Sequence, residues 1–207
     1  MTTLSDTHPP KTHSPGSREP EPGSRLLKIT GAQFDSMVEH GAFDDFPPSK
    51  IELIHGELRI VSPAGPIHCD LIDYLTRWSV QSNADNRYSV RVQSCVVAGE
   101  NRLEPDLAWL ANRRYTDRHP GPEDVGLMIE VADSSLSFDL RTKSAIYASH
   151  GITEYWVVDA RHRRIHVMRQ PTGDEYDDIQ IITRGNPIAP ACRPEATLDT
   201  VDLFVDA

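Results

Sequence analysis

The runs "RLEPDLAWL" (residues 102–110) and "GLMIEVADSS" (residues 126–135) are apolar and strand-like, yet each contains an acidic residue near its middle. Side chains alternate between the two faces of a strand, and in both runs apolar residues fall on both faces. Strands of this kind are typical of the centre of a sheet that is covered on both sides. We therefore expect Asp106 and Glu130 to lie in or near the protein interior.

Buried carboxylates need compensation, because an unpaired charge in the interior is costly. For one acid alone, an arginine partner or a solvent-exposed strand end is the expected solution. Two acids on successive strands favour another solution, since neighbouring carboxylates repel each other unless a positive charge lies between them. Hard oxygen ligands suit Mg²⁺ or Mn²⁺. The pattern therefore makes Asp106 and Glu130 candidate metal ligands.

The segments around these strands predict a single α/β domain with a mixed central β-sheet flanked by helices. Thr30 and Gln33 have the spacing of a capping box at the start of the first helix. His55 and Gly56 are expected to form the turn of the first hairpin. The predicted order is a helix, a hairpin, a long helix, three strands, a helix and a second hairpin, at residues 29–41, 50–62, 66–82, 87–99, 102–110, 126–135, 138–151 and 153–169.

A lysine interrupts the apolar stripe of the helix that follows the second acidic strand. Leu136, Leu140, Lys143 and Tyr147 share one predicted helix face, while Arg141 points elsewhere. Taken alone, this lysine is explained by a stem that packs in the stripe and a charge that reaches water. With two acids just upstream, Lys143 becomes a candidate for holding a phosphate or orienting a water beside a metal.

The composition separates a tail from the domain. Residues 1–24 are rich in Pro, Ser and Thr and contain almost no large apolar residue, so we expect a disordered tail. Residues 25–207 are long enough to form one domain with a sizeable core. No run approaches the roughly 18 apolar residues of a membrane span. The three cysteines are widely spaced without a CxxC pair, which fits reduced thiols in the cytoplasm and argues against zinc.

The net charge of −10 argues against nonspecific coating of nucleic acid, although it leaves room for a local basic groove. Basic residues do gather in three segments, and solvated loops and turns are the simplest interpretation of them. These segments are residues 112–119, 140–143 and 160–169.

The motifs resemble those of known nucleases. Pro105-Asp106, Glu130 within "IEV" and a following lysine resemble the PD-(D/E)XK nuclease superfamily. More narrowly, the chain resembles the Uma-two family of restriction endonucleases from about residue 26 to its end. The segments that carry this resemblance are, in order, "IELIHGELRIVSP", "EPDLAWL", "IEVADSS" and "DLRTKSAIYASHGITEYWVVD".

The resemblance implies a restriction-endonuclease-like fold and a role for each matching residue. It makes Asp106 and Glu130 the metal-binding acids, Lys143 the catalytic lysine, Glu57 a further catalytic acid, and His68 and Asp139 site-adjacent residues. Two departures from the usual pattern stand out: Ala132 occupies the usual lysine position, and "DSS" replaces "SPS" after the second acid. From the residues alone, Glu57 fits a solvated hairpin face beside Arg59, and His68 fits a polar residue in a first helical turn.

The implied function is an endonuclease that hydrolyses phosphodiester bonds with Mg²⁺ or Mn²⁺. DNA is the expected substrate by resemblance, while the residues themselves do not separate DNA from RNA. Two alternatives stay open: a catalytically silent nucleic-acid-binding or regulatory module, and a metal-dependent hydrolase of a small phosphorylated molecule. Intact Asp106, Glu130 and Lys143 count against the silent module. The sequence leaves open whether the chain forms a homodimer.

Overall fold

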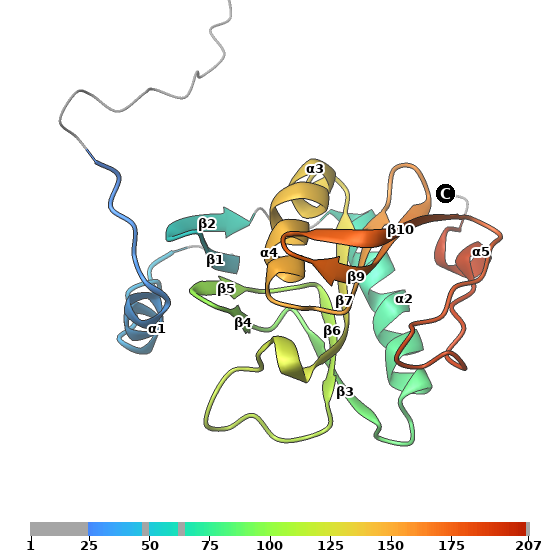
Figure 1. Cartoon of the computed structure of the whole chain (residues 1–207), viewed down its shortest axis with the longest axis horizontal. Helices are drawn as coiled ribbons and strands as arrows, with labels where there is room; N and C mark the ends of the chain where they lie inside the picture. Colours follow the sequence, from blue (N-terminus) through green and yellow to red (C-terminus); the bar gives the residue numbers. More distant parts are fainter. Residues whose placement is uncertain (1–24, 47–49, 62–64, 206–207) are drawn as a thin grey trace, which may run out of the picture.

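The computed structural model describes residues 25–46, 50–61 and 65–205 (Figure 1). The predicted tail, residues 1–24, lies outside the described residues. The helical elements are α1 (Gly31–Glu39), α2 (Pro66–Ser82), η1 (Pro122–Asp124), α3 (Leu136–Phe138), η2 (Asp139–Lys143), α4 (Ser144–Ser149) and α5 (Thr200–Leu203). The strands are β1 (Lys50–Ile54), β2 (Glu57–Val61), β3 (Tyr88–Val92), β4 (Val96–Ala98), β5 (Asn101–Leu103), β6 (Leu107–Ala111), β7 (Val125–Ala132), β8 (Glu154–Asp159), β9 (Arg164–Thr172) and β10 (Glu175–Thr183).

The strands form two sheets within a single α/β domain. The central sheet has six strands in the order β10-β9-β8-β7-β6-β3, and only the pair β7 and β8 is parallel. This is the mixed central sheet that the sequence predicts. A second, four-stranded sheet has the order β2-β1-β5-β4 and was not predicted.

The second sheet exists because two predicted strands are each broken in the middle. Residues 87–99 were expected to form one strand, but the backbone turns at Gln93, whose φ is 45°, and divides them into β3 and β4. Residues 102–110 were likewise expected to be continuous, but they divide at Glu104-Pro105-Asp106 into β5 and β6. Proline has no N–H for a strand ladder. In each case the two halves join different sheets.

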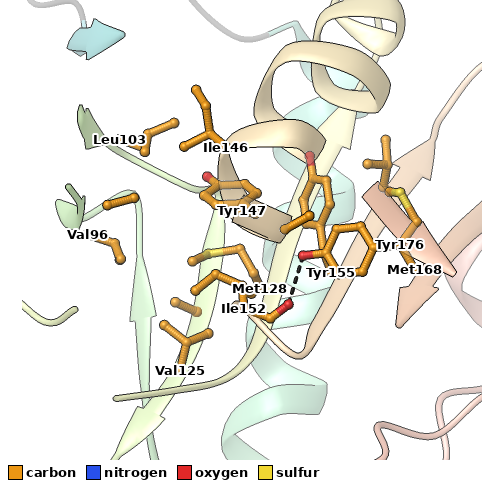
Figure 2. Close-up of a cluster of buried hydrophobic side chains, with 14 of the residues drawn as sticks. Val96, Leu103, Val125, Met128, Ile146, Tyr147, Ile152, Tyr155, Met168 and Tyr176 are labelled. Carbon is orange, nitrogen blue, oxygen red and sulfur yellow. Dashed lines mark hydrogen bonds between the residues drawn. The ribbon is translucent and has the colours of Figure 1, made fainter. Parts of the chain in front are cut away.

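Helices cover both faces of the central sheet (Figure 1). On one face, Leu71 and Leu75 of α2 pack against residues of β6 to β9, with Trp78 stacked on Trp156. On the other face, α4 packs against Met128 and Tyr155, as Figure 2 shows. The two apolar faces of β6 and β7 are therefore both buried, as the sequence predicts.

The helix on the second face contains a π-helical turn. α3, η2 and α4 follow one another without a gap, and the five residues of η2 have the wide π geometry. The segment ends before Gly151, whose φ is 77°, as expected from the sequence. π turns inside α-helices are frequent at functional sites. This turn contains Lys143.

The C-terminal region adds elements that the sequence did not reveal. β10 pairs with β9 in an antiparallel hairpin, and α5 contacts α2. Most residues of β10 are exposed, so this edge strand lacks the apolar alternation that identifies a strand. Tyr176 is buried, and its hydroxyl donates a hydrogen bond to the carbonyl of Ile152 at 2.9 Å (Figure 2). In the described part of the chain, no helix is long and apolar enough to cross a membrane.

Candidate active site

Asp106 and Glu130 lie opposite each other on neighbouring chain segments. β6 and β7 are antiparallel, and their register pairs Leu107 with Ile129. One step further along this register, Asp106 faces Glu130. Directly opposed residues of an antiparallel pair point to the same face. Both carboxylates therefore point toward the face that the π-containing helix covers.

Asp106 is buried, and both of its carboxylate oxygens have hydrogen-bond partners. Its Oδ1 accepts a hydrogen bond from Lys50 Nζ at 3.0 Å. Its Oδ2 lies 3.1 Å from His68 Nε2 and accepts from the backbone N–H of Val131 at 2.9 Å. Burial alone would raise the pKa of Asp106, but the contact with His68 and the charge of Lys50 outweigh it and hold the pKa well below its usual range. Asp106 is therefore an anion at neutral pH.

Glu130 is buried beside Lys143. Lys143 Nζ donates to Glu130 Oε1 at 2.8 Å, and the hydroxyl of Tyr147 donates to the same oxygen at 3.1 Å. Lys143 Nζ also donates to Glu52 Oε1 at 3.1 Å. Burial, aided by the charge of Asp106, raises the pKa of Glu130 to about 8 in spite of Lys143. Glu130 therefore holds its proton more tightly than a solvated glutamic acid does.

Lys143 remains charged in this environment. Burial by itself would lower the pKa of Lys143, but the charges of Glu130 and Glu52 raise it above its ordinary value. The lysine side chain is only 7% exposed, and the π turn directs it inward between two carboxylates. Lys143 is thus a fixed cation and not a lysine that reaches bulk water.

One cleft with a volume of about 560 Å³ lies against both acids and Lys143. Of the residues that the sequence nominates, five line this cleft: His68, Asp106, Glu130, Asp139 and Lys143. Asp139 is buried at the start of η2 and accepts a hydrogen bond from the Ser135 hydroxyl at 2.5 Å. Burial raises the pKa of Asp139.

Comparison with known proteins gives the family. A family model described as "Uma2: Putative restriction endonuclease" matches residues 34–200. The chain belongs to the Uma2 family. This match confirms the resemblance seen in the sequence. No curated protein matches the chain.

A solved structure confirms the fold of this Uma2 protein. The crystal structure titled as "a putative nuclease belonging to DUF820" from Anabaena variabilis ATCC 29413 superposes with a TM-score of 0.64. The match covers 85% of this chain and 97% of the other, at 14% sequence identity. At this identity, the similarity shows a shared fold.

Glu57 does not lie with the other nominated residues of this Uma2 protein. Its side chain is 54% exposed at the start of β2 and lies 3.9 Å from Lys28. It does not line the cleft. The acid of this hairpin that lies in the cleft is Glu52, which is buried and accepts from Lys143 and from the backbone N–H of Glu104 at 2.8 Å.

Sequence reasoning therefore missed Glu52, together with Lys50 and Tyr147. Glu52 lies opposite Arg59 across the hairpin, and the sequence placed Arg59 on a solvated face. A signal was available, since Glu52 is the single acid in the otherwise apolar run "IELI", as Asp106 and Glu130 are in theirs. Tyr147 lies in the same apolar stripe as Lys143, where its hydroxyl needs a buried partner.

The donor chemistry of the cleft suits a hard divalent cation. Asp106 and Glu130 provide carboxylate oxygens, and Glu130 Oε2 has no hydrogen-bond partner among the described residues. Within residues 25–46, 50–61 and 65–205, no three acidic, His or Cys side chains are grouped as a complete metal site. Mg²⁺ commonly binds one or two carboxylates and completes its shell with water and substrate phosphate oxygens. Two carboxylates therefore fit such an ion.

Proposed function

We propose that this Uma2 protein is a metal-dependent endonuclease that hydrolyses phosphodiester bonds, with DNA as its main substrate. The observation that carries the proposal is the convergence of two opposed acids and a buried lysine, Asp106, Glu130 and Lys143, in one cleft. The family description, restriction endonuclease, supports hydrolysis of nucleic acid and DNA as the polymer.

Asp106 and Glu130 would hold Mg²⁺ or Mn²⁺ in this proposal. The ion would lower the pKa of a bound water and neutralise charge on the phosphate oxygens. Lys50 and His68 each contact one oxygen of Asp106. When the ion binds, these two side chains would move away or share the oxygens with the ion. The hydrogen bond with His68 and the charge of Lys50 meanwhile keep the Asp106 carboxylate ionised.

Lys143 would act on the phosphate or the attacking water. Its ammonium group is fixed by Glu130 and Glu52 rather than free to move, and a preorganised charge costs no reorganisation during the reaction. Tyr147 donates to Glu130 from the same helix and holds that carboxylate in place. Glu52 thus acts through Lys143 as a positioning residue.

A substrate panel tests the proposal. The purified chain should be incubated with supercoiled plasmid, linear DNA, RNA and free nucleotides, each with Mg²⁺, Mn²⁺ or a chelator. Cleavage of plasmid DNA with either metal and none with the chelator is the expected result. Cleavage of nucleotides but not of polymers would instead identify a hydrolase of small phosphorylated molecules.

A second candidate is a module that binds nucleic acid without turnover. Two observations favour it. Both carboxylate oxygens of Asp106 already contact protein side chains, Lys50 and His68. Among the described residues, no third side chain joins the two acids as a metal ligand. Plasmid binding without nicking at any metal concentration would support this candidate.

The location and the oligomeric state of the protein are also proposals. We propose a cytoplasmic location, because Cys69, Cys95 and Cys192 are free thiols in the described part of the chain. A homodimer stays a prediction that light scattering of the purified chain would test.

A further inference from the structure

Arg59 of β2 occupies an unusual position at the cleft. The hairpin register places it directly opposite Glu52. Opposite charges at such positions normally form an ion pair. Here the guanidinium instead lies over the ring of Phe138 in α3, 4.0 Å from the ring centroid, and Glu52 pairs with Lys143. Arg59 and Phe138 both line the cleft, so their contact links β2 to α3 across it.

The charge of Arg59 is available to an external anion. Among the described residues that line the cleft, Lys50 and Lys143 each contact a carboxylate. Arg59 is the remaining lysine or arginine of this lining, and no described carboxylate forms an ion pair with it. Its side chain belongs to an exposed strand, whereas Glu52 and Glu130 are buried. Arg59 therefore lies at the mouth of the cleft, and the acids lie at its floor.

The stacked geometry prepares Arg59 for a phosphate. A guanidinium is planar, and its N–H donors point outward in that plane. Stacking one face on Phe138 uses the cation–π attraction and restricts the side chain, but it leaves the edge with its donors free. Such an edge binds two oxygens of one phosphate at the same time. The arrangement thus provides a positioned anion-binding fork.

We propose that Arg59 binds a phosphate that flanks the bond to be cleaved. This inference rests on the proposed function, which puts the cleaved phosphate at the floor beside Asp106, Glu130 and Lys143. Because Arg59 lies at the mouth, it contacts a different phosphate of the same strand. The preferred substrate is therefore an oligonucleotide or polymer, and a diester with a single phosphate lacks this contact.

Turnover of two substrates tests the role of Arg59. The substrates are an oligonucleotide and bis(4-nitrophenyl) phosphate, a diester without flanking phosphates, both with Mg²⁺. Arg59→Met should raise the KM for the oligonucleotide about tenfold or more, as expected for one charge-assisted contact, with a much smaller change in kcat. The loss of kcat/KM on the oligonucleotide should be far larger than any loss of kcat/KM on the small diester. Arg59→Lys should be intermediate, because it keeps the charge without the fork.

Two further variants make the test specific. Phe138→Leu removes the stacking surface but keeps Arg59. It should raise the KM for the oligonucleotide less than Arg59→Met does. Arg77→Met, an exposed arginine of α2 that does not line the cleft, should match the parent protein. An unchanged oligonucleotide KM in Arg59→Met, or an equal loss on both substrates, would overturn the inference.

Binding separates a failure of this inference from a failure of the proposed function. The affinity for a labelled oligonucleotide should be measured by fluorescence anisotropy over a range of salt concentrations with a chelator present. Loss of one phosphate contact should reduce the slope of log K against log salt by about 0.7 to 0.9 in Arg59→Met. This result can hold even if the parent hydrolyses neither substrate. An identical slope, or a parent protein that does not bind the oligonucleotide, would contradict the role of Arg59.

Discussion

Replacement of Lys143 by methionine should reduce turnover and stability for separate physical reasons. Methionine keeps an apolar stem of similar length but removes the ammonium group that lies 2.8 Å from Glu130 and 3.1 Å from Glu52. Loss of one preorganised charge at a reacting phosphate typically lowers the rate by about a hundredfold to a thousandfold. Binding of Mg²⁺ should survive, because an ammonium group is not a ligand for this ion.

The stability cost follows from the two carboxylates that remain buried. Removal of one partner from a buried ion pair costs about 3–5 kcal/mol. At pH 7 the loss should lie at the lower end of this range, because Glu130, whose pKa is raised to about 8, already holds its proton there, and this pKa rises further without Lys143. A group with a raised folded-state pKa loses its stabilising effect as pH rises through that value. The difference from the parent should therefore widen as pH rises above about 8, where Glu130 loses its proton in the parent but keeps it in the variant.

The assay combines nicking of supercoiled plasmid, chemical denaturation with a chelator, and calorimetric titration with Mg²⁺. Arg141→Met is the matched control, because this neighbouring side chain is exposed and does not line the cleft. It should leave stability nearly unchanged and affect turnover far less. Parent-like turnover of a folded Lys143→Met protein would refute the catalytic role of this lysine.

Three other predictions concern the site and the core. Glu52→Gln should lower turnover, because it removes one of the two carboxylates that position the Lys143 ammonium group, whereas Glu57→Gln should leave turnover unchanged. A larger loss of plasmid nicking in Glu57→Gln than in Glu52→Gln would identify Glu57 as the functional acid. Glu130→Gln should reduce, by on the order of a few kcal/mol, the fall in metal-free stability that the parent shows as pH rises from about 4.5 through 8. An unchanged pH slope in denaturation would contradict the raised pKa of Glu130. Leu75→Ala should lower the free energy of unfolding by about 2–5 kcal/mol, and the exposed Val80→Ala by less than about 0.5 kcal/mol; equal losses would mean that α2 does not pack as described.

Local signals in the sequence were sufficient for the first two helices and the first hairpin. The predicted long helix at 66–82 coincides with α2, where a proline start and apolar residues at helical spacing agree. The hairpin turn at His55 and Gly56 is also observed, and both residues have positive φ. These features depend on interactions within a few residues.

The second sheet could not be predicted, because it depends on breaks within apolar runs. Gln93 adopts a positive φ although its sequence context reads as a continuous strand, and Pro105 separates β5 from β6. Which sheet each half joins is decided by partners far away in the chain. β5, for example, pairs with β1 through Leu53 and Arg102.

The sequence predicted the clustering of Asp106, Glu130 and Lys143, because each is a charged residue where an apolar one is expected. Glu52 follows the same rule, but its cross-strand partner Arg59 suggested a solvated face. Only the three-dimensional structure shows that Arg59 lies on Phe138 while Glu52 takes part in the buried cluster. Pairing in register was therefore not enough to identify which charges interact.

The most direct test of the account is nicking of supercoiled plasmid by the parent protein and by Asp106→Asn, with Mg²⁺ and with a chelator. Asparagine keeps the shape of the side chain but removes the negative charge that acts on Glu130. We predict metal-dependent nicking by the parent, none with the chelator, and none by a folded Asp106→Asn protein. Nicking that survives in this variant, or that persists with the chelator, would contradict the account.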